Sequence, residues 1–476
     1  MLEGLEVSVL KLSEILIDNI DFRVDSEYFG KKYLNFDLFL KSKKSDIISK
    51  YAKVSDGDHS KFPDNQKEEV RYLQAKDIKN HFIEDNNPVY ISREYFNKNK
   101  RSHVTEENVI LSIMGSVGDI AITPKGFIPT LANRAVAIIK DIKELNPYYL
   151  FTYLSTKYGQ LQIDRQKNGG VQERINLDVL SKVKIPFVKN EFQKEIENIV
   201  KSSHGRRKET KQAYNQAESI LLKEIGLQNY EPSKEPVNIK SFKESYLQND
   251  RIDSEYYQVK YDVIEKTFDK FNRKRILDII NYPVSSGVTP KAGGDDYTDF
   301  ENGIPFIRAV DLQDCEVLIN NCNYIKPNIH NGVLKRTQLK YNDVLLSIAG
   351  TVGRAAIFKH KVPANINQAV AILRFDEIDL KRLYLIVFFN TDIGKEFVSK
   401  YSRQGVQTNL NLSEVGNLSI PIIDYKKQVQ IAELVEESFK LKSESKRLLE
   451  VAKRAVEIAI EIDEKTAIKY IKDNTI

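Results

Sequence analysis

Cysteine and histidine are scarce in this chain of 476 residues, which has two cysteines and six histidines. Two thiols are too few for a disulfide framework, so we expect a reducing, cytoplasmic environment. Cys315 and Cys322 both lie in the second half without partners in the first, which favours two ordinary thiols over a zinc site. Six histidines also leave little material for general acid–base catalysis.

Long apolar runs and the common catalytic motifs are missing as well. No stretch approaches the length that crosses a bilayer. The start, Met1 to Glu6, lacks the basic and apolar parts of a signal peptide, so we expect no leader. The sequence has no Gly-x-x-x-x-Gly-Lys phosphate loop, no His-x-x-x-His and no Cys-x-x-Cys. We therefore expect no catalytic residues, no metal site and no cofactor held by the chain itself.

The chain also has only a small excess of charge of one sign. The chain carries 72 basic and 67 acidic residues, a net charge of +5. A protein that binds polyanions without regard to sequence would normally be more basic. Basic residues do gather locally, as at Arg206, Arg207 and Lys208, although a single run of this kind usually marks a solvated face.

What the sequence does contain is one pattern in two copies, the first before and the second after a linker near residues 229–248. Three segments recur: Leu111–Gly118 as Leu346–Gly353 and Gly170–Gln172 as Gly405–Gln407, both 235 positions later, and Arg23–Phe29 as Arg251–Tyr257, 228 positions later. Repeats of about 20 to 50 residues indicate solenoids, so this longer period indicates two whole domains. Two related but non-identical domains suit a target with two parts.

Each copy contains short apolar runs that predict strands and a longer run that predicts a helix. A Gly-x-x-Gly turn joins two of the strands as a hairpin, which argues against a phosphate cradle ahead of a helix. Each copy is therefore predicted to be mixed α/β without a βαβ rhythm. The predicted strands are Val70–Leu73, Val109–Ile113, Ile120–Ile122, Ala135–Ile139, Pro305–Ile307 and Ala369–Leu373, and the predicted helices are Pro147–Gln162 and Leu383–Tyr401.

Each copy ends in a charged segment with apolar or small residues at heptad spacing. Sustained heptads predict that the two helices pair with each other as an antiparallel coiled coil, the alternative being that each helix packs only on its own domain. The predicted heptad positions are Ile196, Ile199, Ser203, Arg206, Thr210, Ala213, Ala217 and Ile220 in the first helix, and Ile431, Leu434, Ser438, Leu441, Ser445, Leu448, Ala452 and Ala455 in the second.

Two segments, Asn146–Tyr149 and Asn87–Tyr90, are similar to the Asn-Pro-Pro-Tyr loop with which adenine-N6 methyltransferases hold a flipped base. Both lack the second proline, and neither lies in a glycine-rich cofactor-binding sandwich. We therefore interpret both as turns from a strand into a helix.

Taken together, the pattern resembles the DNA-specificity subunits of type I restriction–modification systems over nearly the whole chain. The resemblance lies in the two domains, each followed by a long helix, and in local strings. These strings are Gly350–Gly353, Ala355–Ile357, Asn365, Asn367, Gly405–Gln407, Asn411-Leu412, Ile420-Pro421 with Gln428, and the early loops Asp56–His59 and Gly287–Pro290. In one departure, acidic Glu173 stands where the second copy has Thr408, so the two segments need not do the same job.

The resemblance implies a fold and a division of the chain. We expect two similar target-recognition domains separated by an antiparallel two-helix coiled coil, with a pseudo-two-fold internal repeat. The implied parts are a first recognition domain over 1–188, a spacer helix over 189–228, a linker over 229–248, a second recognition domain over 249–424 and a second spacer helix over 425–476.

The resemblance also implies a function. The chain would be a non-catalytic subunit that reads a bipartite, asymmetric site in double-stranded DNA and binds two modification subunits. Those partners would carry S-adenosylmethionine and methylate adenine, and a restriction subunit with motor and nuclease activity would join through them. Three alternatives remain open: a related defence system without the type I nuclease, a self-contained methyltransferase, and a scaffold whose two heads bind proteins.

Loops rich in Arg, Lys, Gln, Asn and Ser should face the DNA, because Arg suits guanine while Gln and Asn suit adenine. Phosphate and sugar take most protein–DNA hydrogen bonds, so we expect a minority of the candidates to touch bases. The candidates in the first copy are His59, Lys61, Gln74, Lys76, Arg101, Arg134, Arg165, Lys167, Gln172 and Arg174, and those in the second are Thr289, Lys291, Arg308, Arg354, Gln368, Arg403, Gln404, Gln407 and Asn409.

Overall fold

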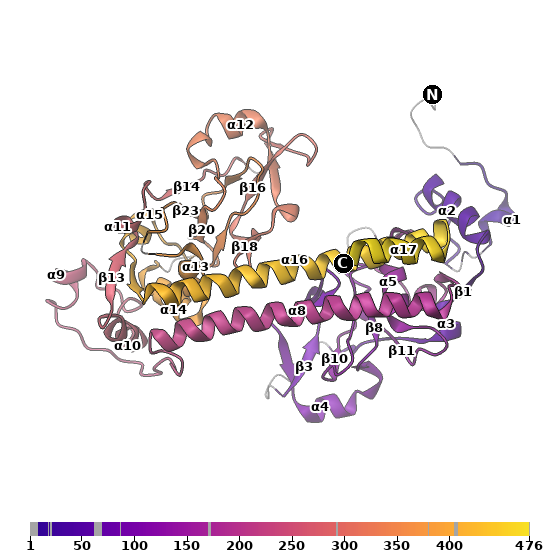
Figure 1. The fold of residues 1–476 in the computed structure, drawn as a ribbon, viewed down its shortest axis with the longest axis horizontal. Coiled ribbons are helices and arrows are strands. Elements are labelled where there is room, and N and C mark those ends of the chain that lie inside the picture. Colours follow the sequence, from indigo (N-terminus) through magenta and orange to yellow (C-terminus); the bar gives the residue numbers. More distant parts are fainter. Residues whose placement is uncertain are drawn as a thin grey trace. The chain divides into compact units, whose positions relative to one another are not determined.

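The structure, a computed structural model, forms two compact units. It describes residues 8–17, 19, 21–60, 69–85, 87–169, 173–291, 294–378, 380–403 and 408–475. The first unit comprises Met1–Lys208 and Leu441–Ile476, and the second comprises Glu209–Lys440. Each unit therefore holds the strands of one copy together with part of each long helix (Figure 1).

Two four-stranded sheets form the body of the first unit. Their strand orders are β6-β3-β10-β7 and β2-β11-β8-β9, and within the described part of these two sheets only β3 and β10 pair in parallel. The strands of the first sheet are β3 (Val70–Leu73), β6 (Val89–Ile91), β7 (His103–Val104) and β10 (Thr130–Ala132), and those of the second are β2 (Lys53–Asp56), β8 (Val109–Ser112), β9 (Ile120–Ile122) and β11 (Val136–Lys140).

Continuous apolar runs form β8 and β11 because both faces of this sheet are covered. Side chains alternate along a strand, so Val109 and Leu111 face a core shared with the helices, while Ile110 faces a core shared with the other sheet. All three side chains are fully buried. The hairpin prediction is confirmed, since β8 pairs antiparallel with β9 across a turn in which Gly115 and Gly118 have positive φ.

The second unit repeats this construction with a six-stranded and a four-stranded sheet. The orders are β14-β23-β20-β21-β18-β17 and β15-β19-β16-β22, with β16 and β22 parallel, and β18 and β21 parallel as well. Val344 and Leu346 face one core and Leu345 the other, as in the first unit. The strands are β14 (Ser285–Ser286), β15 (Tyr297–Thr298), β16 (Ile304–Ile307), β17 (Leu312–Gln313), β18 (Glu316–Val317), β19 (Asn323–Ile325), β20 (Val344–Ser347), β21 (Ala355–Ile357), β22 (Asn365–Ile366) and β23 (Val370–Leu373).

The helix predicted over Pro147–Gln162 is two helices, so that prediction was wrong. α5 (Pro147–Ser155) ends at Thr156, whose extended backbone starts α6 (Lys157–Arg165). The Thr156 hydroxyl accepts a hydrogen bond from the Gly159 N–H (3.3 Å) and so caps the new helix. A Cβ at Gly159 would lie 2.4 Å from the carbonyl oxygen of Tyr153, so the break brings backbone against backbone.

The helix predicted over Leu383–Tyr401 breaks in the same way, into α13 (Arg382–Asn390) and α14 (Asp392–Tyr401). The Thr391 hydroxyl accepts from the Gly394 N–H (2.9 Å). A Cβ at Gly394 would lie 1.9 Å from the Phe388 carbonyl oxygen. A Thr-x-x-Gly break is thus a shared feature of both units.

The two long helices are α8 (Asn190–Glu224) and α16 (Tyr425–Glu461), and each unit contains a stretch of both (Figure 1). In the first unit, the Ser203 hydroxyl donates to the Ser445 carbonyl and the Ser445 hydroxyl to the Ser203 carbonyl, both at 2.8 Å. In the second unit, Ala217 and Ile431 share a core. Early residues of α8 meet late residues of α16 and the reverse, so the predicted antiparallel pairing is confirmed.

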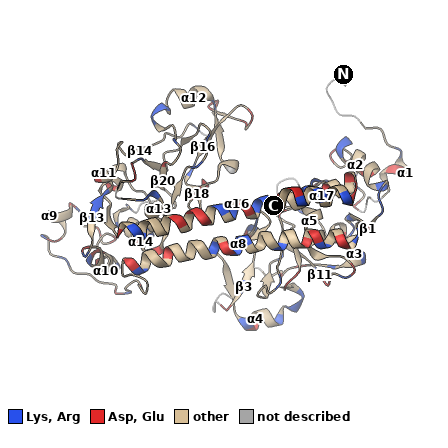
Figure 2. Cartoon of the chain, in the orientation of Figure 1, with Lys and Arg blue, Asp and Glu red and all other residues tan. Residues whose placement is uncertain are grey.

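The heptad register holds at most positions and fails at some. Ser203, Thr210 and Ala217 are buried on α8, but Arg206 is exposed, so its placement in the register was wrong. Ile220, Leu434 and Leu441 are only partly buried, and Leu221, Val435 and Lys442, one position further on, take the buried places. Both signs of charge recur along α8 and α16 (Figure 2).

The start of each long helix is fastened to its own unit by a buried glutamine. Gln193 accepts a hydrogen bond from the Asn146 N–H (2.9 Å) and donates to the Val188 carbonyl (3.0 Å). Gln428 accepts from the Lys381 N–H (3.0 Å) and donates to the carbonyl of Ile423 (2.9 Å). The helices therefore pair with each other and also pack on the domains.

The second spacer was expected as one element over 425–476, and the structure has two helices there. α16 ends at Glu461, and α17 (Glu464–Thr475) begins after Asp463, whose carboxylate accepts from the Thr466 N–H (2.8 Å). Ala467 and Ile471 of α17 are buried in the core of the first unit. The other expected domain boundaries remain predictions.

Among the described residues, no helix is both long and apolar enough to cross a membrane.

Candidate nucleic-acid interface

In the first unit, the candidate residues meet where the parallel strands β3 and β10 end. The Asn133 N–H, just after β10, donates to the carbonyl of Leu73, the last residue of β3 (2.9 Å). The Asn133 side chain accepts from the Ala135 N–H (3.1 Å), which shapes a turn with Arg134 exposed at its tip. Gln74 follows β3 directly and therefore lies beside this turn.

The early loop crosses the same place. The Gly57 N–H donates to the carbonyl of Val136 (3.1 Å), and a Cβ at Gly57 would lie 2.1 Å from the Asn133 carbonyl oxygen, so only glycine fits. Two residues later His59 contacts the Asp56 carboxylate (2.5 Å). We call the surface formed by residues 57–60, Gln74 and residues 133–135 the first strand-end surface.

The Asp56 carboxylate joins two candidates from different segments. It accepts from His59 and from Arg101 (2.6 Å), a residue that follows α4 (Arg93–Lys98). The side chains of His59 and Arg101 are 65% and 71% exposed, so both can still reach a ligand. The structure thus brings His59, Gln74, Arg101 and Arg134 together.

A buried carboxylate organises the loop from below. Asp58 is 7% exposed and accepts hydrogen bonds from the hydroxyls of Tyr95 (2.7 Å) and Tyr72 (3.3 Å), while Ser60 donates to the same side chain (3.2 Å). Burial, together with the charge of Asp58, raises the pKa of Tyr72 well above its usual range. Sequence reasoning did not single out this network, because its members lie on three separate segments.

The second unit builds an equivalent strand-end surface from residues 287–291, Arg308 and residues 367–369. The Asn367 N–H donates to the Ile307 carbonyl (3.0 Å), and its side chain accepts from the Ala369 N–H (3.0 Å). A Cβ at Gly287 would lie 1.7 Å from the Ile366 carbonyl oxygen, so the early loop again needs glycine. Thr289, Lys291 and Gln368 are exposed.

A second group of candidates lies beside the Gly-x-x-Gly turns. Backbone hydrogen bonds join Asn168 to Arg174 in both directions (2.8 Å each), and the Gly115 N–H donates to the Glu173 carbonyl (3.2 Å). In the second unit Arg403 and Asn409 are joined in the same way, and the Gly350 N–H donates to Thr408 (3.3 Å). Arg174, Arg403 and Asn409 are exposed.

The two groups adjoin within each unit. The Ile113 N–H donates to the Ala135 carbonyl (2.8 Å), and the Ile175 N–H donates to the Ile113 carbonyl (3.1 Å). The end of β8 therefore lies between the turn that carries Arg134 and the segment that carries Arg174.

An arginine from each recurring Arg-x-Asp motif holds the helix that leads into this second group. Arg23 donates to the Lys167 carbonyl (2.7 Å) and to both oxygens of Asp25 (2.7 Å each). Arg251 donates to the Tyr401 carbonyl (3.2 Å) and to both oxygens of Asp253 (2.8 and 2.6 Å). The hydrogen bond to Asp25 raises the pKa of Arg23, and that to Asp253 raises the pKa of Arg251.

Several candidates have roles inside the fold instead. Arg165 donates to the Tyr28 carbonyl (2.9 Å) and to Asp37 (2.6 Å), so its guanidinium holds the opening segment and does not face solvent. Lys167 pairs with Asp164 (2.6 Å). Both residues thus have partners within the first unit, and their role as DNA contacts stays a prediction.

The remaining candidates are placed as follows. Lys76 is exposed, and Arg354 is partly buried and donates to the Leu312 carbonyl (3.2 Å). Arg403 pairs with Glu414 (3.0 Å) and is 73% exposed. Four candidates lie outside the described residues, namely Lys61, Gln172, Gln404 and Gln407, and so do the two Gly-Val-Gln strings.

Asn146 caps a helix, as expected of a strand-to-helix turn. Its side chain accepts from the Tyr148 N–H (2.9 Å) and donates to Glu197 of α8 (2.7 Å). Burial would raise the pKa of Glu197, but hydrogen bonds from Lys201, Lys194 and Asn146 lower it to about 2. Asn87, in contrast, precedes β6 with a φ of 52°, so it lies in a turn into a strand and our interpretation of that segment was wrong.

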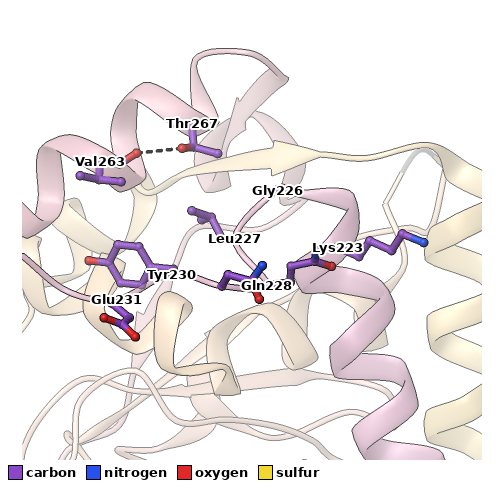
Figure 3. A pocket seen from close by; sticks show the side chains of 9 residues that line it. Lys223, Gly226, Leu227, Gln228, Tyr230, Glu231, Val263 and Thr267 are labelled. Carbon is purple, nitrogen blue, oxygen red and sulfur yellow. Dashed lines mark hydrogen bonds between the residues drawn. The ribbon is translucent and has the colours of Figure 1, made fainter.

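The described part of the chain shows no group of histidine, cysteine and carboxylate side chains that could hold a metal ion. Cys315 and Cys322 are both buried, and no disulfide joins them. An open pocket of about 560 Å³ lies where α8 ends, against α10 (Val259–Phe268), and Figure 3 shows its lining. Lys223 and Glu231 are the charged residues of this lining, and none of the DNA-binding candidates belongs to it.

Comparison with known proteins matches both copies to one family. Residues 46–222 and 269–453, one range in each copy, match the family model of the type I restriction modification DNA specificity domain. Over 141 residues, 30% of this chain, the sequence is 29% identical to the type I restriction enzyme EcoBI specificity subunit from Escherichia coli, and the aligned stretch spans 30% of that relative.

Two solved structures are also similar. The S subunit of a type I restriction–modification system from M. genitalium has 12% identity and a TM-score of 0.38, with 90% of this chain and 95% of that chain covered. The HsdS subunit from Thermoanaerobacter tengcongensis has 13% identity and a TM-score of 0.29, with 88% and 97% covered. Because both TM-scores are low, the family match carries the assignment.

Specificity subunits are the DNA-recognition components of restriction–modification complexes and are not themselves catalytic. The resemblance inferred from the sequence is thus confirmed, and this chain belongs to the type I restriction–modification DNA specificity family.

Proposed function

We propose that this chain reads a bipartite, asymmetric site in double-stranded DNA, one half-site with each strand-end surface. The observation that carries the proposal is the recurrence of one loop arrangement in both units with different side chains, all exposed or partly exposed: His59, Gln74 and Arg134 in the first, and Thr289, Arg308 and Gln368 in the second. Loops on a rigid sheet are suited to recognition, because the sheet fixes the direction of each side chain.

The chemistry of methylation would come from partners. We propose that two modification subunits bind this chain, carry S-adenosylmethionine and methylate adenine, and that a restriction subunit joins through them. The near balance of charge, +5 over the chain, supports this division, because the partners can supply much of the phosphate neutralisation.

We further propose that the paired helices set the gap between the half-sites. α8 has 35 residues, which corresponds to roughly 50 Å of helix, or on the order of 15 base pairs. Inserting one heptad into both α8 and α16 should lengthen the gap by about 10 Å, or roughly three base pairs. An unchanged gap in the methylated sites of that variant would refute the proposal that the helices set the gap length.

The direct test maps methylated adenines in cells that express the modification subunits with or without this chain. We expect one bipartite motif that depends on the chain. A gel shift of the complex with duplexes that carry each half-site separates DNA reading from a scaffold role. Binding of labelled S-adenosylmethionine by the isolated chain would favour a self-contained methyltransferase, and methylation without any DNA cleavage would favour a system that lacks the nuclease.

A further inference from the structure

Gln74 and Arg308 occupy the same place in the two strand-end surfaces. Each follows the strand that pairs in parallel, β3 or β16, and each precedes a 3-10 turn with nearly equal backbone angles (φ −112°, ψ 159° and φ −114°, ψ 166°). The Gln74 N–H donates to Asp77 (2.9 Å) and the Arg308 N–H to Asp311 (2.8 Å). The two side chains therefore leave the backbone in the same direction.

Arg134 and Gln368 form a second equivalent pair. Each follows the asparagine, Asn133 or Asn367, that links the two parallel strands. Each also precedes an alanine whose N–H donates a hydrogen bond to the side chain of that asparagine. Both side chains are exposed at the tip of the turn. The first unit thus presents Gln then Arg at these two positions, and the second unit presents Arg then Gln.

The buried aspartate of each 3-10 turn has a different basic neighbour in the two units. Asp311 accepts hydrogen bonds from Nε and Nη2 of Arg308 itself (3.0 Å each), which fixes the plane of the guanidinium. Asp77, which faces Gln74, instead has Arg71 of β3 at 3.9 Å. An arginine that is held by a carboxylate loses less side-chain entropy when it binds a base edge.

We propose that these two positions read base edges in each half-site, and that the exchange of Arg and Gln exchanges guanine and adenine between the two half-sites. Arg donates two hydrogen bonds to guanine O6 and N7, and Gln pairs with adenine N6 and N7. This inference rests on the proposed function and assigns the side chains that confer the specificity. His59 and Arg101, which share Asp56, then contact the DNA backbone beside the first pair.

The test is the reciprocal double exchange in the full complex with its modification subunits. Q74R with R134Q gives the first unit the arrangement of the second, and R308Q with Q368R does the opposite. Mapping of methylated adenines should show that each variant changes the base preference at two positions of one half-site, by roughly five- to a hundredfold. The other half-site and the gap should stay unchanged, so each variant controls for the other.

Charge-conserving and single variants keep the inference falsifiable if a double exchange does not fold. R134K keeps the charge but loses the planar fork, so it should relax the preference at one position. Q74A should relax it at the other position. Wild-type preference in these variants would mean that the side chains contact phosphate or solvent, and would overturn the inference. If instead the wild-type complex methylates no bipartite site, the proposed function itself fails.

Discussion

The two recognition domains of this chain share a frame and differ at its edge. Both break a helix at a Thr-x-x-Gly step, both shape the early loop with a glycine against the neighbouring strand, and both fasten a long helix through a buried glutamine. The early loops then diverge, since Asp58 is buried in a tyrosine network whereas Val288, the corresponding residue, is 57% exposed.

This difference separates the residues that hold the fold from those that we propose read DNA. The shared residues are buried or hydrogen-bonded to backbone, so a change there disturbs packing. The residues that differ lie at strand ends and loop tips, where substitutions cost little stability. Substitutions at these exposed positions can therefore change the recognised DNA sequence without disturbing the packing of the domain.

A second difference concerns the contact between each domain and the long helix that follows it, α8 or α16. In the first unit, the ring of His204 lies 5.1 Å from that of Phe82, and its Nε2 is buried without a hydrogen-bond partner in the described structure. Burial lowers the pKa of His204 to about 4. The position 235 residues later is Phe439, which packs against the core of the second unit. Only the first of these contacts should respond to pH.

The largest effect on stability is expected at the glycines of the helix breaks that both domains share. Gly159→Ala and Gly394→Ala would each place a methyl group within 2.4 Å of backbone, which should cost about 3 kcal/mol of stability. Thermal unfolding followed by circular dichroism should show a lower midpoint for both variants. Gly205→Ala is the matched control, because nothing lies near that helical position, and it should be neutral or stabilising by about 0.5–1 kcal/mol.

Acid should distinguish the two domains with the next largest effect. The folded pKa of His204 is below the unfolded value of about 6.5, so its contribution is present above that pH and is lost as pH falls toward 4. Between pH 7 and pH 5 the loss should be about 2 kcal/mol. Urea midpoints of the wild type and of His204→Phe, which carries the aromatic residue of the second copy, measure it. An equal acid response in both proteins would contradict the assignment.

A smaller effect should follow from exchanging the early loops. Asp58→Val removes the acceptor of the Tyr72 hydroxyl and should cost about 1–2 kcal/mol, whereas Val288→Asp, at an exposed position, should change stability by less than about 0.5 kcal/mol. In DNA binding, Asp58→Val should weaken only the first half-site, since Asp58 organises the loop that carries His59. Gel shifts with each half-site altered in turn would detect equal weakening of both, which would be evidence against this role.

Prediction from the sequence succeeded where burial is continuous. The strands at Val109 and Val370 were found because both faces of their sheets are covered, so the runs are apolar throughout. The helix breaks at Thr156 and Thr391 were missed. Each break allows a close backbone approach between two successive helices, which the threonine in the sequence does not indicate. The sequence did not reveal that Arg165 anchors a distant segment, because such an arginine looks like one that faces DNA.

The sequence by itself determined the duplication, the strands, the paired helices and the family, because each depends on local pattern or on spacing that recurs. The tertiary structure decided which candidates meet. Gln74 and Arg134 are neighbours only because β3 and β10 pair in parallel, which brings the ends of two strands, and the side chains that follow them, to one edge.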